Sequence, residues 1–176
     1  EIKEYWESVK PHLNPELPIP TVDQKTLEAI IGMPFLGGND ARLLIDGEAT
    51  FAAIYEAIRA ARSYILVQFY ILRDDAIGNE FANLVINKAR EGVRVSVLYD
   101  EVGSKDLTDE YCDRLAAGGV DVRPFATRQG WNNYFQFNFR NHRKVVVVDG
   151  ETAFVGGLNV GDEYLSRDKA CSPWRD

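Results

Sequence analysis

The 176-residue sequence is poor in residues that bind metals or form disulfides, with two cysteines and two histidines. Cys112 and Cys171 lie far apart without a CxxC spacing, which predicts reduced structural thiols. His12 and His142 have no partners at metal-ligand spacing, so no metal site is expected. The longest apolar stretch, residues 64–72, is interrupted by a glutamine and falls short of the roughly 18 residues that a membrane-spanning helix needs. These scarcities argue against a disulfide scaffold, a metalloprotein and a spanning segment.

Positive charge is also scarce, since the formal net charge is −7. Nucleic-acid-binding surfaces are usually basic, so no nucleic-acid partner is expected. A local basic pocket remains compatible with this balance, because Arg140, Arg143 and Lys144 lie close together in the sequence. With 45% hydrophobic and 27% charged residues, the composition is typical of a soluble globular protein that contains one domain of this length.

Residues 1–40 differ from the rest because four prolines fall within ten positions, at Pro11, Pro15, Pro18 and Pro20. Proline at this density blocks regular structure and predicts an extended arm or linker, with a short helix over residues 24–31. The arm could lie on the domain surface or tether the domain to an upstream element such as a membrane anchor. No signal peptide opens the chain and Glu1 replaces an initiator Met, so we expect a piece of a longer protein.

From residue 41 to residue 176 the pattern alternates between strand and helix. Strands are predicted over residues 42–45, 64–72, 93–100 and 120–125. Three helices are predicted: one that begins after Thr50 as its cap, one around Phe81, and one over residues 108–117. Such alternation predicts an α/β sandwich, with helices flanking a mixed, largely parallel sheet. The strand over residues 64–72 is expected to be buried on both faces. Ligand sites in such folds lie beyond the strand ends, where Asp74, Asp75 and Asp100 are expected as mostly solvated loop carboxylates.

Residues 127–139 are rich in asparagine, glutamine and aromatic side chains. Two interpretations stay open. The segment packs onto the sheet, or its rings line a pocket beside His142 and contact lipid or glycerol carbon.

The run from Asn141 to Gly157 carries the chemistry. A hairpin is predicted over residues 144–148 and 152–155, with its turn at Asp149-Gly150. Alternate side chains of an extended chain share one side, so His142 and Lys144 should point together. An imidazole beside an ammonium suits a phosphodiester, because lysine offsets oxyanion charge while imidazole attacks phosphorus or moves a proton. Asp149 falls on the opposite face inside the turn, which favours a structural cap over a hydrogen bond to His142.

After the hairpin, Gly156 and Gly157 would let the backbone approach a phosphate, and Asn159 could donate an amide N–H to it. A histidine near a lysine is more often an ordinary surface pair than a catalytic one, so these residues alone leave the choice open.

A resemblance to the phospholipase D superfamily strengthens the catalytic interpretation. The run His142-x-Lys144-x-x-x-x-Asp149, followed by Gly156-Gly157-x-Asn159, is similar to the signature of that superfamily. Bacterial cardiolipin synthases are the closer likeness, on the segments 69–78, 98–104, 141–144, 156–165 and 173–176. Gln68 departs from the pattern, which more often has glutamate there.

The resemblance implies that His142 attacks phosphorus to give a phosphohistidine, with Lys144 and Asn159 binding the phosphate and no metal or other cofactor. Arg140, Gly156 and Gly157 are candidate substrate contacts. Asp149 completes the motif, and the resemblance implies that Asp176 orients the histidine. The second histidine of such a site would come from another half of the same protein or from a homodimer, because His12 has no lysine two positions on.

The implied reaction is transphosphatidylation, in which phosphatidylglycerol is converted to cardiolipin and glycerol at the surface of a bacterial membrane. The parent protein is then expected at the bacterial cell membrane, on its cytoplasmic face or bound peripherally. This fragment is expected to be soluble. Two alternatives stay open: hydrolysis with water as the acceptor, as in a phospholipase D or a nuclease, and a catalytically silent binding or dimerisation module.

Overall fold

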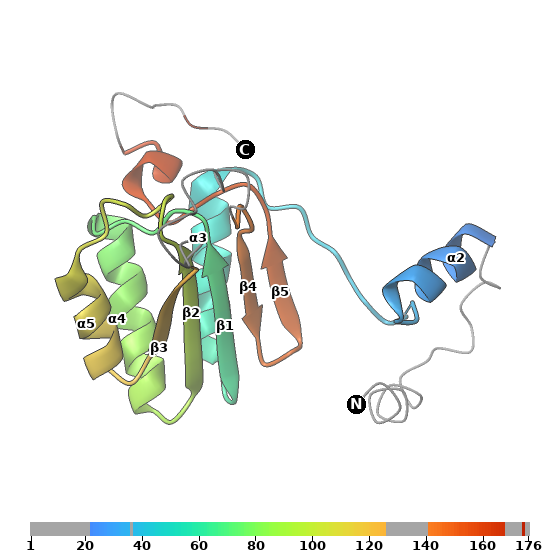
Figure 1. The fold of residues 1–176 in the computed structure, drawn as a ribbon, viewed down its shortest axis with the longest axis horizontal. Coiled ribbons are helices and arrows are strands. Elements are labelled where there is room, and N and C mark those ends of the chain that lie inside the picture. Colours follow the sequence, from blue (N-terminus) through green and yellow to red (C-terminus); the bar gives the residue numbers. More distant parts are fainter. Residues whose placement is uncertain (1–21, 36, 126–140, 168–173, 175–176) are drawn as a thin grey trace, which may run out of the picture. The chain divides into compact units, whose positions relative to one another are not determined.

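In a computed structural model the described residues are 22–35, 37–125, 141–167 and 174. The contacts divide the chain into two units, residues 1–43 and 44–176. In the first unit, helix α2 (Val22–Ile31) confirms the predicted short helix. The described residues of the second unit form nine elements. Eight are labelled in Figure 1: α3 (Asp46–Ala60), β1 (Tyr64–Phe69), α4 (Ala76–Arg90), β2 (Arg94–Asp100), α5 (Asp109–Ala117), β3 (Asp121–Phe125), β4 (Val145–Val148) and β5 (Thr152–Val155). The ninth is the 3-10 helix η2 (Asp162–Leu165).

The strands form one mixed sheet in the order β3-β2-β1-β4-β5. Strand β1 pairs in parallel with β2, and β2 in parallel with β3, because α4 and α5 return the chain to the same edge each time. The hairpin β4–β5 adds to the other side of β1 in antiparallel orientation. The predicted α/β class and mixed sheet are confirmed.

The helices pack on one face of this sheet. Helix α4 contacts β2, α5 contacts β3, and α3 contacts β4 and α4. Right-handed crossovers place the helices of consecutive parallel units on the same side, which accounts for this arrangement. The core between the layers is apolar, and the fully buried side chains in it include Ile58, Ile65, Phe81, Val85 and Leu115.

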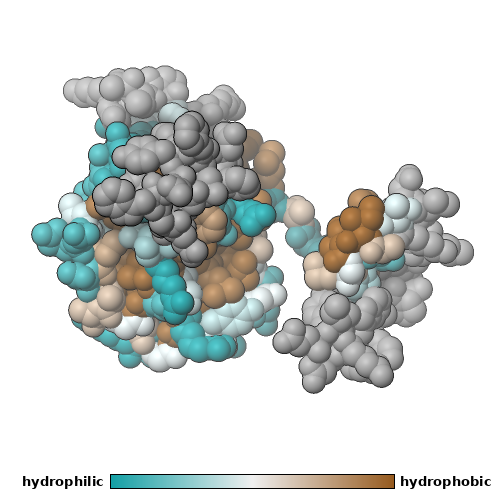
Figure 2. Space-filling view, in the orientation of Figure 1, coloured by the Kyte–Doolittle hydropathy of each residue, from teal (hydrophilic) through white to brown (hydrophobic). Residues whose placement is uncertain are grey.

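No helix of the described residues covers the other face of the sheet. Along β1, Ile65, Val67 and Phe69 are buried, whereas the alternate residue Leu66 is 46% exposed. The expectation that the strand would be buried on both faces is therefore wrong. Within the described part of the chain the helices cover one face alone, and Figure 2 shows hydrophobic side chains at the surface over the strands of Figure 1.

The start of α3 also differs from the expectation. Residues 41–45 form no strand, and the helix begins at Asp46. Thr50 is not a cap, because its hydroxyl donates to the Asp46 carbonyl within the first turn, with O···O 2.8 Å. Gly47 is required here, since an added Cβ would lie 2.0 Å from the Tyr164 carbonyl oxygen. The start of the helix is therefore in close contact with η2, and the local sequence does not reveal that contact.

Helix α4 is joined to η2 by two reciprocal aspartates. The Asp162 carboxylate accepts from the N–H groups of Ala76 at 3.2 Å and Ile77 at 3.0 Å. Asp75, the N-cap, accepts from Gly78 N–H at 2.9 Å and from Asp162 N–H at 2.7 Å. The free amides of the first helical turn thus find acceptors on a segment more than eighty positions later in the chain.

We expect Asp162→Ala to lower the free energy of unfolding by about 1–2 kcal/mol, as losses of helix caps do. Chemical denaturation of the purified protein measures this change. Glu151→Ala, on the exposed turn between β4 and β5, is the control and should leave the unfolding midpoint in place. Equal midpoints for the wild type and Asp162→Ala would contradict the assigned role.

Candidate functional site

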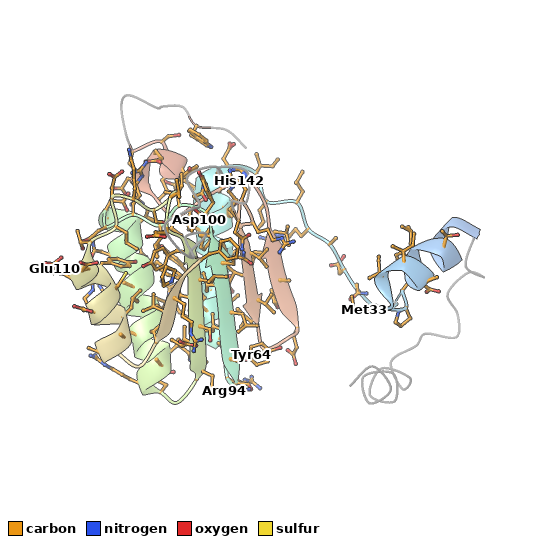
Figure 3. The ribbon with its side chains drawn as sticks, viewed as in Figure 1. Met33, Tyr64, Arg94, Asp100, Glu110 and His142 are labelled. Atoms are coloured by element: carbon orange, nitrogen blue, oxygen red, sulfur yellow. The ribbon has the colours of Figure 1, made fainter. Side chains whose placement is uncertain are left out.

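The candidate site lies where the ends of β1 and β2 meet the beginning of β4. Because β4 runs antiparallel to β1, with Val145 opposite Gln68, the residues before β4 arrive at the C-terminal end of β1. Figure 3 shows His142 and Asp100 at this end of the sheet, away from Tyr64 and Arg94 at the other end. The sheet topology thus gathers His142, Lys144 and Asp100 at one edge, where sites of open α/β sheets form.

His142 and Lys144 are in direct contact. The Lys144 ammonium nitrogen Nζ lies 3.0 Å from Nε2 and 3.1 Å from Nδ1 of the imidazole, and it donates to the His142 carbonyl at 3.0 Å. The prediction that the two side chains point together is confirmed, although residues 141–144 precede β4 and are not part of it. His142 is exposed and Lys144 is 6% exposed, so a buried cation supports an accessible imidazole.

Tyr70 forms an aromatic wall beside this pair. Its ring centroid lies 4.6 Å from that of His142, with an interplanar angle of 60°. Lys144 Nζ lies 5.4 Å from the same centroid, within the range of a cation–π contact. The Tyr70 ring therefore contacts both His142 and Lys144.

Asn159 connects the site to β1. Its side-chain oxygen Oδ1 accepts from the Ile71 N–H at 2.9 Å, and its Nδ2 donates to the Tyr164 hydroxyl at 2.8 Å. The residue is 4% exposed. Part of its hydrogen-bonding capacity is therefore used to hold the chain after β1, and phosphate binding by its amide stays a prediction.

The other predicted substrate residues are placed differently. Gly156 and Gly157 are exposed at the end of β5, and an added Cβ at Gly156 would meet no atom within 4 Å. Space for a ligand is thus open at Gly156. Arg140, Asp176 and the aromatic segment 127–139 lie outside the described residues, so their predicted roles stay predictions.

Asp149 lies at the opposite end of β4 from His142. Its carboxylate accepts three backbone N–H groups, from Arg62, Ser63 and Tyr64, each with N···O 2.8 Å. These donors hold the pKa of the Asp149 carboxyl below its usual range. Asp149 has a φ of 55°, which places it in the left-handed turn that ends β4. The motif aspartate therefore holds the start of β1.

Sequence reasoning missed Asp100. We expected a solvated loop carboxylate, but Asp100 is 2% exposed and both its oxygens are bonded. Oδ1 accepts from Val102 N–H at 2.9 Å and Gly103 N–H at 3.0 Å, and Oδ2 accepts from Asn141 N–H at 3.0 Å. The spacing Asp-x-x-Gly after a strand could have indicated the bonds to Val102 and Gly103, because aspartate often accepts from amides two and three positions on.

The described residues contain neither a metal-binding cluster nor a membrane-spanning helix. No cluster of three or more histidine, cysteine or acidic side chains in the described ranges could hold a metal ion. None of the helices in the described ranges is long and apolar enough to cross a membrane. Cys112, in α5, is a free thiol.

Comparison with known proteins identifies what the chain is similar to. The sequence model described as "Cardiolipin synthase, PLD-like domain" matches residues 54–170. Cardiolipin synthase A of Pseudomonas entomophila is 58% identical over 144 residues, which cover 82% of this chain and 30% of that protein. Cardiolipin synthase A of Pseudomonas syringae pv. syringae is 55% identical over the same shares. The chain therefore spans less than a third of the length of these relatives.

Among solved structures, Nuc from Salmonella typhimurium, described as a phospholipase D family member, aligns with a TM-score of 0.49 and 19% identity. The alignment covers 64% of this chain and 66% of that one.

The Asp149 contacts predict a pH-dependent contribution to stability. Because folding lowers the pKa of this carboxyl, the contribution is present above the ordinary carboxyl pKa and is lost as pH falls through the lowered one. Asparagine tolerates a positive φ, so Asp149→Asn keeps the turn. We expect this variant to melt at a lower temperature than the wild type at neutral pH, and the difference in melting temperature to shrink in acid. Thermal unfolding across pH measures this margin, with Asp113→Asn on exposed α5 as the control. A margin that stays constant into acid would refute the assignment.

Proposed function

The chain belongs to the phospholipase D-like (PLD-like) domain family of cardiolipin synthases, and from that premise we propose that it supplies one half of a phosphatidyltransferase site. The observation that carries the proposal is the contact between the exposed His142 imidazole and the buried Lys144 ammonium, at the edge of the sheet. A nucleophilic nitrogen next to a fixed cation is what displacement at a phosphodiester needs.

The proposed reaction has two displacements. In the first, a ring nitrogen of His142 attacks the phosphorus of phosphatidylglycerol, a P–N bond forms and the P–O bond to the glycerol headgroup breaks. An acid from the other half of the site protonates the departing glycerol oxygen. In the second, a headgroup hydroxyl of another phosphatidylglycerol attacks the phosphohistidine and gives its proton to that same group, which is now a base. The P–N bond breaks and cardiolipin leaves.

Each nearby side chain has a part in this scheme. Lys144 lies where it can offset the charge that gathers on the phosphoryl oxygens in each transition state. Tyr70 limits the rotation of the imidazole through its ring contact. Gly156 leaves open the space that a phosphate would occupy. The scheme requires no metal and no other cofactor.

A second histidine must come from outside this motif, because the only other one in the sequence, His12, is followed by asparagine at position 14 in place of lysine. We propose that the second motif comes from the remaining length that the relatives possess, since the chain covers 30% of them. A second copy of this chain is the other possible source. The whole protein would then act on phospholipid at a bacterial membrane surface.

Hydrolysis is the second candidate function, and the exposure of His142 favours it, because water can reach a phosphohistidine as well as a lipid hydroxyl can. The 176-residue chain alone would be silent in both reactions if one half cannot assemble two histidines. Product identity separates these cases.

We predict that the protein in its full natural length converts phosphatidylglycerol in vesicles to cardiolipin and glycerol, and that His142→Ala lowers the rate by at least about 1,000-fold, as losses of nucleophiles do. Mass spectrometry of the lipids measures both. His12→Ala, the same substitution at the other histidine, is the matched control and should retain the wild-type rate.

Three other outcomes would change the assignment. Phosphatidic acid as the sole product would show hydrolysis and overturn the transferase proposal. Full activity of His142→Ala would remove His142 as the nucleophile. Activity of the 176-residue chain as a strict monomer would refute the half-site proposal.

A further inference from the structure

A buried carboxylate lies close to the candidate nucleophile but is not part of the motif. Asp100 ends β2, is 2% exposed, and has no direct contact with the imidazole among the interactions of the described residues. Burial of a carboxylate is costly unless its oxygens are bonded, and both oxygens of Asp100 accept backbone N–H groups. The question is what its three hydrogen bonds hold in place.

The first bond reaches the residue that precedes the motif. Asp100 Oδ2 accepts the N–H of Asn141, the residue immediately before His142, across forty-one positions of sequence. Residues 141–144 lie outside β4, and the pairing with β5 extends to this segment only at Lys144, whose carbonyl accepts from Gly156 N–H at 3.4 Å. The Asp100 carboxylate is therefore an anchor of the backbone just ahead of the imidazole.

The other two bonds close the loop of residues 100–104, here called the Asp100 loop. Oδ1 accepts from Val102 and Gly103 N–H, and this turn brings Gly103 and Ser104 against Tyr70. An added Cβ at Gly103 would lie 2.2 Å from the Tyr70 carbonyl oxygen and 2.9 Å from its ring, so the approach requires glycine. The Ser104 hydroxyl donates to the same carbonyl at 3.2 Å and accepts from Leu72 N–H at 3.0 Å.

Both routes end at His142. One runs from Asp100 through Asn141 to the backbone of the histidine, and the other runs through the Asp100 loop to Tyr70, whose ring lies 4.6 Å from the imidazole. A single buried carboxylate thus holds the backbone before the ring and the wall beside it.

We propose that Asp100 is a positioning residue for His142, and that the Asp100 loop sets the direction in which the imidazole meets phosphorus. The inference rests on the proposed function. In-line displacement depends on the angle and distance of attack, and a displacement of about 1 Å costs roughly 100-fold in rate. Lipid binding depends on other groups, so a positioning defect lowers kcat and leaves KM nearly unchanged.

The test is Asp100→Asn in the protein in its full natural length, assayed on phosphatidylglycerol vesicles beside the wild type and His142→Ala. Asparagine has the same shape, but one carboxylate oxygen becomes an NH2 that cannot accept an amide hydrogen. We expect kcat to fall about 10- to 100-fold while KM changes less than about threefold. Asp106→Asn is the matched control, because this neighbouring aspartate is exposed and pairs with Arg73 at 3.3 Å; its kcat should equal that of the wild type.

A second measurement does not depend on turnover. In hydrogen–deuterium exchange, the peptide that contains Asn141 should exchange faster in Asp100→Asn than in the wild type, while peptides of α3 and α4 exchange at unchanged rates. If Asp100→Asn does not fold, Ser104→Ala takes its place. It removes the hydroxyl that holds Tyr70 and should lower kcat about 3- to 10-fold at unchanged KM.

The outcomes separate the two claims. A wild type that transfers no phosphatidyl group overturns the proposed function. An active wild type with Asp100→Asn at full kcat, or with a loss confined to KM, overturns the positioning role. A loss of kcat accompanied by faster exchange throughout the domain also overturns it, because the effect would then be general destabilisation.

Discussion

The site depends on one kind of interaction, in which side-chain oxygens accept backbone N–H groups at the ends of strands. A sheet satisfies the amides inside its ladders, but the segments that enter and leave a strand need other acceptors. Asp149 supplies them at the start of β1, Asn159 supplies one just beyond its end, and Asp100 supplies them after β2. Asp149 and Asn159 are distant in sequence from these donors, and Asp100 bonds both to the loop that follows it and to the distant Asn141. The bonds of Asn159 and Asp100 therefore connect segments around the candidate site, and those of Asp149 connect segments at the other end of β4.

The need for acceptors at strand ends explains why the motif residues lie at two ends of β4. His142 and Asp149 are seven positions apart, and at about 3.3 Å per residue an extended chain would separate them by roughly 20 Å. Strand β4 occupies that interval, with Val146 and Val148 buried in the core. The histidine and lysine therefore face the candidate site at one end of the strand, while the aspartate fixes β1 at the other. The spacing of the motif corresponds to the length of one strand that is held at both ends.

Local signals in the sequence were sufficient for most elements and insufficient where distant segments meet. The valine run of residues 145–148 and the Asp149-Gly150 turn predicted the hairpin correctly, and the helix over residues 108–117 was also predicted, because these signals are local. The start of α3 and the burial of Asp100 were wrong, since Gly47 meets Tyr164 and Asp100 meets Asn141 only in the fold. The open face beside Leu66 was also missed, because an apolar strand alone does not reveal which layers cover it.

The accessibility of His142 has a consequence for the choice between transfer and hydrolysis. Lys144 is buried beneath the imidazole, yet the ring itself is exposed, so the residues that hold His142 do not shield it from water. A phosphohistidine formed there would be open to any hydroxyl that reaches it, and a lipid acceptor competes with concentrated water only if the site closes over the intermediate. On the proposed function, the surface that brings the second histidine must therefore also exclude water. Acceptor choice would then be set by how the two halves fit together, whereas the orientation of the nucleophile is already built into this half.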